Sequence, residues 1–389
     1  MQVKKSILML TAALLVGSLS AQEPLEVSGF FQARTSYTSG KSSLVATVPT
    51  PNGNMDMTLL DSDGSYTTGD LQQMNLLFRK ELNQNFTAWV NLEFLNTFST
   101  ERDWGAINLE EAWVRYSRSS RFAVKVGLVV PTFNYFNEVK NRMPLIPYIS
   151  RPLLYEPTLR DIFPVEDFIP ERALIQGYGK VPVGKGYFSY AAYLGKAETS
   201  YWASNSDEVD GGLNSSDTTN FFLVGGRVGL EVDHLNAGVS ATFDKDNQQP
   251  TLGEDVNRIR IGADAQVNFS KIFGEGEIII VKESPEANVD LNKMFYYATL
   301  GVNLSESAFV YGNYSELKDN YIDFLISGLQ GFLLGAGYRP TYSVVLKAQY
   351  SRSWSKGDFD LFVPQLGGEV PASIDLDYNS FSVAVSVLF

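Results

Sequence analysis

Segments in which apolar and polar side chains alternate recur along the whole of this 389-residue chain. In one of them Ile259 and Ile261 share one face, while Arg258 and Arg260 share the other. A period of two residues is that of a β-strand with one apolar and one polar face. We predict sixteen strands, give or take two, because several segments alternate poorly, 106–117 among them. The predicted strands are 25–37, 70–80, 85–96, 106–117, 121–130, 172–181, 185–196, 220–232, 234–244, 256–269, 272–283, 292–303, 306–317, 328–339, 341–354 and 375–389.

The links between these strands alternate strictly in length. Short links follow every second strand, and long links separate the resulting pairs. Each pair is therefore expected to be a hairpin, with tight turns at one end and long loops at the other. Bacterial outer-membrane barrels sort their loops in this way, with short periplasmic turns and long extracellular loops. The sequence thus predicts an all-β transmembrane antiparallel β-barrel of 14–18 strands, most simply 16. The long links are 38–69, 97–105, 131–171, 197–219, 245–255, 284–291, 318–327 and 355–374.

Proline positions give an independent test of this map. All sixteen prolines lie outside the predicted strands, and seven of them lie in 131–171. A proline cannot donate to a strand ladder, and a closed barrel has no free edge where one could be tolerated. Beyond the first 21 residues no run of about 18 apolar residues exists, so the sequence predicts no spanning helix.

The first 21 residues have the three parts of a secretory signal: a basic start, an apolar run of about a dozen residues and an exit of small residues. Cleavage after Ser20 and cleavage after Ala21 both fit, and an ordinary buried helix is the alternative. We expect 22–389 to form one barrel domain. Two of the 31 basic residues leave with the signal, so the remaining charge is 29 minus 44, or −15. Such an acidic chain argues against nucleic acid as a partner.

The chain ends on a strand whose last residue is aromatic. If this strand closes a barrel, every second side chain touches lipid and the residues between them face the lumen. This ending resembles the C-terminal recognition signal of outer-membrane proteins, which the barrel-assembly machinery reads. The lipid-facing residues of the expected insertion signal are Phe381, Val383, Val385, Val387 and Phe389.

The stretch 107–138 resembles a hairpin of Gram-negative outer-membrane porins of the phosphate-selective porin O/P-type family. In that group a strand with an acidic and aromatic start meets a strand that ends in glycine, followed by an exit into a long loop. The matching residues are Glu111, Ala112, Trp113, Tyr116, Gly127, Pro131 and Phe133. The resemblance covers about 70–170 and implies a sixteen-stranded, trimeric channel. It does not carry phosphate specificity, because the chain lacks a dense arginine ladder.

The polar faces of the strands are expected to line a water-filled lumen. The basic side chains expected there are Arg79, Lys125, Arg227, Arg258, Arg260, Lys293, Arg339 and Lys347. The acidic ones are Glu93, Glu231, Asp264, Glu275 and Glu277. This small basic excess predicts a mild anion preference, because charges that line a pore set its ion preference. The alternative is that these charges pair with one another and confer little selectivity.

The longest link, 131–171, is rich in aromatic and charged residues. Structureless loops of this length are uncommon and usually functional. We predict that it folds into the barrel and narrows the pore, with Arg142, Arg151 and Arg160 facing the permeant. Its place as the third long loop resembles that of the constriction loop of porins. The alternative is an external lid packed across the other loops.

The sequence offers no catalytic, cofactor-binding or metal-binding constellation. The only histidine, His234, falls in a tight turn at the periplasmic end, and a calcium loop through Asp61, Asp63 and Asp70 has incomplete spacing. We therefore predict no enzyme and no cofactor, but a passive diffusion porin for small hydrophilic solutes or ions in the lipid bilayer of a Gram-negative outer membrane. The alternative is an outer-membrane barrel with an enzymatic or surface-binding role and no open pore.

Overall fold

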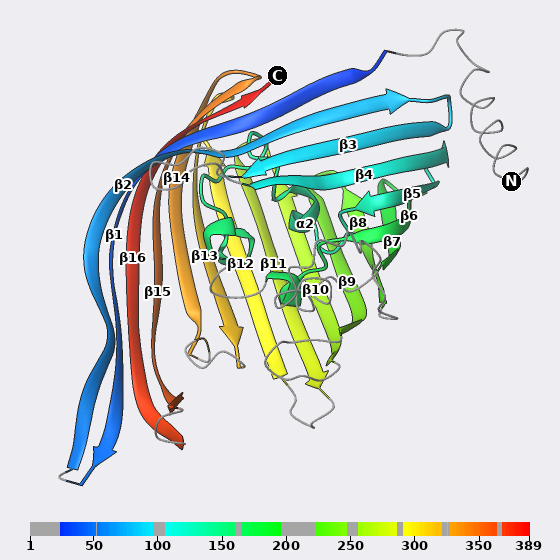
Figure 1. Ribbon diagram of the computed structural model, residues 1–389. Coiled ribbons are helices and arrows are strands. Elements are labelled where there is room, and N and C mark those ends of the chain that lie inside the picture. Colours follow the sequence, from blue (N-terminus) through cyan, green and yellow to red (C-terminus); the bar gives the residue numbers. More distant parts are fainter. Residues whose placement is uncertain are drawn as a thin grey trace, which may run out of the picture.

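The computed structural model describes residues 24–51, 53–95, 106–159, 165–195, 222–246, 256–285, 291–320, 325, 327–363 and 368–389. Within these ranges sixteen antiparallel strands form one closed barrel (Figure 1). Each strand pairs with its neighbours in sequence, and β1 closes the ring against β16. The predicted fold class and strand number are confirmed.

The strands differ widely in length, and the longest are the first two and the last two. The strands are β1 (Glu26–Thr50), β2 (Gly53–Glu81), β3 (Phe86–Leu95), β4 (Ala106–Ser119), β5 (Phe122–Val129), β6 (Ala173–Val183), β7 (Gly186–Gly195), β8 (Leu223–Val232), β9 (Leu235–Asp246), β10 (Val256–Asn268), β11 (Ile272–Pro285), β12 (Leu291–Asn303), β13 (Ala308–Asp319), β14 (Leu329–Thr341), β15 (Val344–Val363) and β16 (Gly368–Leu388). Short helices between β5 and β6 are α2 (Phe136–Val139), η1 (Leu153–Tyr155), η2 (Pro157–Leu159) and α3 (Val165–Phe168). No helix in the described part of the chain is long and apolar enough to cross a membrane.

The alternation seen in the sequence places apolar side chains on the outside of the barrel and polar ones on the inside. On β10, Ile259 and Ile261 point outward and are 46% and 56% exposed, whereas Arg258 and Arg260 point inward and are 2% exposed. This is the reverse of a water-soluble fold. Hydrocarbon can cover such an outer surface, because a closed ladder has no free edge strand with unpaired backbone groups.

The predicted short links are tight turns at one end of the barrel. They join β2 to β3, β4 to β5 and every second pair thereafter, ending with the turn between β14 and β15. Gly184, in the turn between β6 and β7, has a φ of +60°, a conformation that glycine adopts without steric cost. The predicted long links 97–105, 197–219, 245–255 and 284–291 lie largely outside the described residues.

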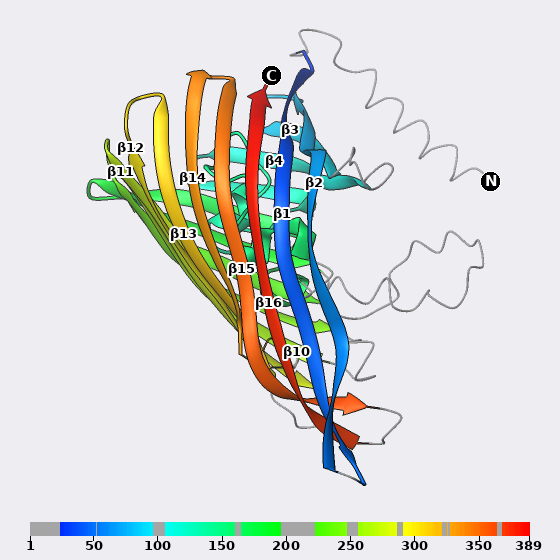
Figure 2. The ribbon, with the colours of Figure 1, turned by 90° about the vertical axis from the view of Figure 1, so that its left-hand side faces the viewer.

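Two predicted long links are wrong, because the strands on either side of them continue. β1 and β2 extend through 38–69 and meet at a tight turn, and β15 and β16 take up most of 355–374. Figure 2 shows these four strands projecting beyond the others. Five prolines also lie within strands, each close to a strand end where one missing donor costs the ladder little. They are Pro49, Pro182, Pro285, Pro340 and Pro371.

The polarity of the strands inverts in this projecting part, which explains the misreading. By the ladder register, Leu44 and Ala46 of β1 lie opposite Ile374 and Ala372 of β16 and share the inner face that Ser382 occupies further along. The inner face is thus polar within the barrel and apolar beyond it. The alternation of apolar and polar residues therefore changes phase along each of these strands. Because the segments are also rich in Ser, Thr and Asp, the sequence alone predicts loops there.

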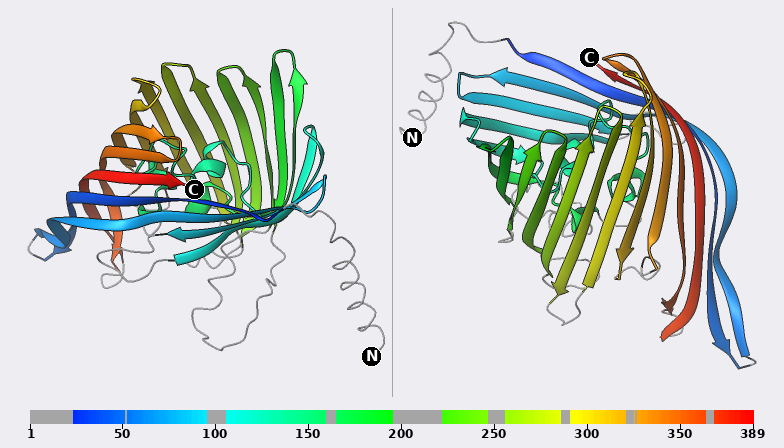
Figure 3. Two further views of the ribbon diagram at one scale, coloured as in Figure 1. Left: turned by 90° about the horizontal axis from the view of Figure 1, so that it is seen from above. Right: turned by 180° about the vertical axis from the view of Figure 1, so that it is seen from behind.

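The main apolar core lies inside the barrel. It consists of residues of the β5–β6 loop, which we define as 130–172, together with inward-facing residues of β6–β8 and β11–β15 and with Leu325. The left view of Figure 3 shows this loop within the ring of strands. Much of the interior is therefore filled by packed side chains.

Candidate functional site

The β5–β6 loop is hydrogen-bonded through its backbone to inward-facing side chains of the wall. The Phe136 amide donates to Glu277 Oε1 of β11 at 2.6 Å, and the Ile149 amide donates to Gln349 Oε1 of β15 at 2.8 Å. These bonds satisfy backbone groups that a loop buried away from water would otherwise leave unpaired. The loop is thus attached to the wall at specific points along its length.

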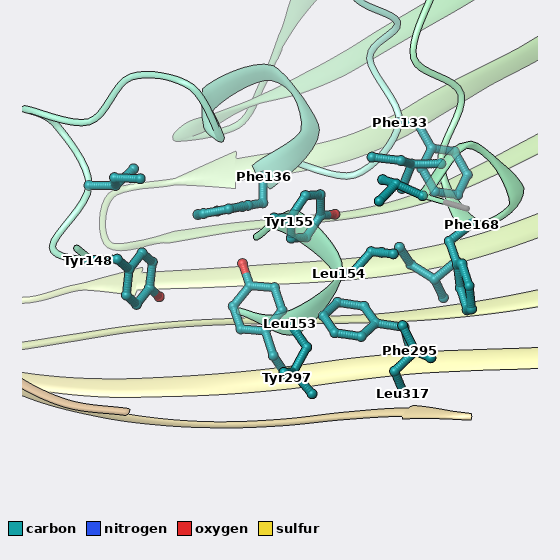
Figure 4. Packing of buried hydrophobic residues seen from close by; sticks show 14 of the residues in the cluster. Phe133, Phe136, Tyr148, Leu153, Leu154, Tyr155, Phe168, Phe295, Tyr297 and Leu317 are labelled. Atoms are coloured by element: carbon teal, nitrogen blue, oxygen red, sulfur yellow. The ribbon is translucent and has the colours of Figure 1, made fainter. Parts of the chain in front are cut away.

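Aromatic rings attach the same loop to β11 and β12 (Figure 4). The Phe136 ring lies 4.7 Å from Tyr155, 5.7 Å from Tyr297 and 5.9 Å from Tyr148, measured between ring centroids. The Tyr155 hydroxyl donates to Glu277 Oε2 at 2.6 Å. Such ring pairs contribute about 0.5–1.5 kcal/mol each beyond the area they bury. The aromatic residues of the β5–β6 loop therefore form a packed core against one side of the barrel.

Lys347 of β15 holds the middle of the loop. Its buried ammonium donates to the backbone carbonyls of Met143 at 2.6 Å, Ile146 at 2.9 Å and Tyr148 at 2.9 Å, and to Gln32 Oε1 at 3.1 Å. A buried charge is tolerated only when hydrogen bonds replace its hydration. Lys347 was predicted to line the pore, and the structure places it on the inner wall, engaged by the loop backbone.

Asp167 of α3 anchors the far end of the loop to the wall. Its carboxylate accepts from Arg258 at 2.7 Å and from Lys293 at 2.5 Å, and Arg260 Nε donates to its backbone carbonyl at 2.9 Å. Asp244 of β9 pairs with both arginines, at 3.0 and 2.6 Å. Burial alone would raise the pKa of Asp167, but the adjacent Arg258 and Lys293 outweigh it, so that this pKa lies below its ordinary value. Arg258 and Arg260, both predicted to line the pore, lie ion-paired beneath the loop.

The structure also places two other predicted pore-lining arginines in ion pairs. Arg227 of β8 is paired with Asp264 of β10 at 2.6 Å, with both side chains buried. Arg79 of β2 pairs with Glu26 at 2.9 Å near the tight-turn end. Arg160 lies outside the described residues.

Of the remaining predicted basic residues, Arg339 lies over the Phe309 ring, 4.5 Å from its centroid. Lys125, Arg142 and Arg151 line cavities that adjoin one another through the barrel. The inner cavity, nearest the tight turns, has a volume of about 230 Å³ and is lined by Lys125 and Arg142 among others. The middle cavity has about 170 Å³ and the outer one about 360 Å³, and both are lined by Arg151. The middle and inner cavities have two lining residues in common, Glu110 and Asn141.

A β-bulge in β4 explains the position of Glu110. Asn91 of β3 pairs with Glu111, and the next residue, Leu92, pairs with Leu109, so Glu110 has no partner across the ladder. A bulge of this kind re-aims side chains, and here both glutamates line the inner cavity. Sequence reasoning missed both residues as candidates. The poor alternation of this strand was the signal that could have identified them.

Neutral donors hold these carboxylates in place. Glu111 accepts from the indole nitrogens of Trp113 at 3.0 Å and Trp89 at 3.2 Å, and the two indole rings stack with centroids 5.8 Å apart. The Lys125 ammonium lies 4.8 Å from the Trp113 ring centroid. Burial raises the pKa of Glu138 on α2, and the nearby Lys125 only partly opposes that increase. The inner cavity is thus a mixed, partly aromatic and charged environment.

The residues weighed for catalysis and calcium binding do not converge. His234 lies in its predicted turn, with Nδ1 3.0 Å from the Asn268 carbonyl. Asp61 lies on the outer face of the projecting strands, whereas Asp70 faces inward and pairs with Arg34 at 2.5 Å. Among the described residues no three acidic or histidine side chains come together in an arrangement that could hold a metal ion.

The C-terminal strand presents its alternate residues outward. Phe381, Val383, Val385 and Phe389 are exposed and Val387 is half-buried. The backbone of the last residue exchanges two hydrogen bonds with Gly29, of 2.8 and 2.9 Å, at the point where the barrel closes.

Comparison with known proteins supports the fold. No protein-family model and no curated protein matches the chain. Among solved structures, it is similar to the anion-selective porin from Comamonas acidovorans, with 14% identity, a TM-score of 0.58 and coverage of 94% of this chain and 99% of that one. It is also similar to the outer membrane channel DcaP of Acinetobacter baumannii, with 10% identity, a TM-score of 0.57 and coverage of 96% and 99%.

A third similar structure is a loop-deletion mutant of OmpT, an outer membrane protein of Vibrio cholerae, with 11% identity and a TM-score of 0.55. It covers 94% of this chain and 100% of that one. At identities this low the likeness shows the fold alone. The chain therefore has the sixteen-stranded barrel fold that outer-membrane porins share.

Proposed function

We propose that this protein is a porin of a Gram-negative outer membrane, through which small hydrophilic solutes or ions diffuse passively. The observation that carries the proposal is the combination of an apolar outer face, a polar inner face and a loop fastened inside the barrel beside adjoining cavities. An apolar exterior requires lipid, and a lumen lined by charges and amides favours water. In this proposal no bond is broken and the protein is not an enzyme.

The β5–β6 loop acts as the constriction in this proposal. Its attachments to the wall keep it from swinging freely, so it sieves solutes by size. The middle cavity, of about 170 Å³, is the smallest of the three cavities and limits the permeant to small solutes. In this proposal Arg142 and Arg151, which line the cavities, face the permeant, and Arg160 has the same role.

The ion preference depends on the charges that remain accessible. The mild anion preference expected from the sequence relied on eight basic residues, and three of them, Arg227, Arg258 and Arg260, are ion-paired and buried. Paired charges contribute little field to the lumen. The alternative of weak selectivity from mutual ion pairs is therefore the better supported of the two for these residues.

Several further features belong to the same proposal. The first 21 residues act as a secretory signal, and the barrel-assembly machinery reads the C-terminal strand from Phe381 to Phe389. The assembly is a homotrimer, as the resemblance to porins implies; OmpT of Vibrio cholerae has been solved in a trimer form. The phosphate-selective porin O/P-type resemblance remains a hypothesis about ancestry, without phosphate specificity.

Recording from the purified protein in planar lipid bilayers tests the proposal. We expect stepwise ion conductance. Neutral solutes larger than the constriction should not enter the pore. Arg142→Ala should change the conductance, whereas Arg352→Ala, on the outer face and paired with Asp377 at 2.9 Å, serves as the matched control. Absence of conductance from correctly folded barrels would refute the porin. Hydrolysis of an ester or peptide substrate would favour a barrel enzyme instead.

A further inference from the structure

A charged side chain belongs to two cavities at each of two points: Arg151 lines the outer and the middle cavity, and Glu110 lines the middle and the inner cavity. At the second point Glu110 and Asn141 line both the middle and the inner cavity, and no other charged residue in the described part of the chain lines both. Glu110 comes from the wall, on β4, and Asn141 comes from the β5–β6 loop. The Asn141 side-chain amide donates to Glu110 Oε1 at 3.0 Å. At this point a hydrogen bond bridges the wall and the loop.

No described cation forms an ion pair with the Glu110 carboxylate there. Its only described hydrogen-bond partner is a neutral amide, and neighbouring Glu111 is held by two neutral indoles. Neither glutamate forms an ion pair with another described residue. This is the opposite of the arrangement at Arg258, whose guanidinium is neutralised by Asp167, Asp244 and Glu283. Neutral donors stabilise a carboxylate without cancelling its field.

The other charges of the inner cavity do not reverse this balance. Lys125 and Arg142 face three carboxylates, those of Glu110, Glu111 and Glu138. The bulge is the reason for the excess, because it lets two consecutive glutamates serve one cavity.

We propose that Glu110 is the specificity-determining residue of this channel and that it favours small cations over anions of equal size. The inference rests on the proposed porin function. A solute moving between the two cavities must displace the Asn141 amide from Glu110 or pass beside it. A cation can replace that amide as the partner of the carboxylate, whereas an anion meets a negative charge that no described ion pair neutralises.

The expected effect follows from Coulomb's law. In a water-filled passage a unit charge about 5 Å from a permeant ion changes the energy of that ion enough to alter the local ion concentration about fourfold. The experiment measures the reversal potential of the full-length protein in planar bilayers under a KCl gradient, and converts it to the permeability ratio of K⁺ to Cl⁻. We expect a ratio above one, and a drop of about fourfold or more in Glu110→Gln. Asp375→Asn, on the outer face with Lys41 and Lys356, is the matched control and should leave the ratio unchanged.

A second variant guards against a folding defect. Asn141→Leu keeps the carboxylate and removes the amide that competes with cations, so the ratio should stay at or above that of the unaltered protein. A conducting channel with a ratio of one or less, or one whose ratio is the same in Glu110→Gln, overturns the role of Glu110 and leaves the porin intact. Absence of conductance in the unaltered protein overturns both.

Discussion

The attachment of the β5–β6 loop at Asp167 can be tested by replacing this residue with Asn. The substitution keeps the size of the side chain and removes its charge, so the buried pairs with Arg258 and Lys293 lose their anion. The bond from Arg260 to the backbone carbonyl of residue 167 is unaffected by the change of side chain. The effect therefore reports on the ion pairs themselves.

The cost of this change can be estimated from the composition of the cluster. Breaking a buried ion pair by removing one partner costs about 3–5 kcal/mol. Among the described residues the cluster holds three cations and four carboxylates, and the carboxylates that remain after the change are Asp244, Glu283 and Asp319. Three described cations then face three described anions, so each keeps a counter-charge. We therefore expect the lower end, about 3 kcal/mol, which raises the open fraction of this part of the loop about 100-fold.

A single thiol can report this opening, because the chain contains no cysteine. Val165, two residues before Asp167 and 2% exposed, accepts a cysteine in the packed core. Under conditions in which the loop opens and closes faster than the reagent reacts, the labelling rate of Val165→Cys by a polar thiol reagent follows the open fraction. We expect this rate to rise about 100-fold when Asp167→Asn is added.

Asp375→Asn in the same Val165→Cys background is the control, since its carboxylate lies on the outer face of the projecting strands. It should leave the labelling rate unchanged. An increase of less than about threefold in the Asp167→Asn protein, equivalent to under about 0.7 kcal/mol, would refute the view that these ion pairs hold the loop.

Three further outcomes are expected. Lys347→Met leaves three loop carbonyls without their donor, at a cost of about 3 kcal/mol or more, and should increase current fluctuations in single-channel records; a record as quiet as that of the unaltered protein would contradict this. Because burial raises the pKa of Glu138 above the ordinary 4.5, acidification should neutralise it at a pH above that value and lower the cation preference there. Reversal potentials measured from pH 8 downward should show this step, and Glu138→Gln should abolish it. Phe389→Ala removes one ring contact with Phe31, whose centroid lies 6.3 Å away, so the free energy of unfolding in detergent should fall by only about 1 kcal/mol. The amount of assembled barrel in cells, measured by immunoblot, should fall severalfold. A fall no larger than the loss of stability in detergent explains would count against a recognition signal.

The barrel could be derived from sequence because the information that specifies it is local. Whether a residue faces outward or into the lumen depends on its parity within a strand, as Ile259 and Arg258 illustrate. Turn lengths between adjacent strands are also local, and they sufficed for the hairpin order and the closed ring. The failures occurred where the local rule changes along one strand, at the projecting ends of β1, β2, β15 and β16.

The charges that can act on a permeant were decided only by the tertiary structure. Arg258 and Asp167 are 91 residues apart in sequence, and their pairing exists only because the loop folds against β10. Lys347 likewise meets loop carbonyls about 200 residues away. Glu110 reaches the lumen through a bulge, and although β4 alternates poorly, only its pairing with β3 shows where the bulge lies. The sequence alone thus determined the barrel wall, the side of the wall that each residue faces and the sign of the charge that it carries. Pairing energies depend on distance and burial, so only the folded chain determined which charges remain free.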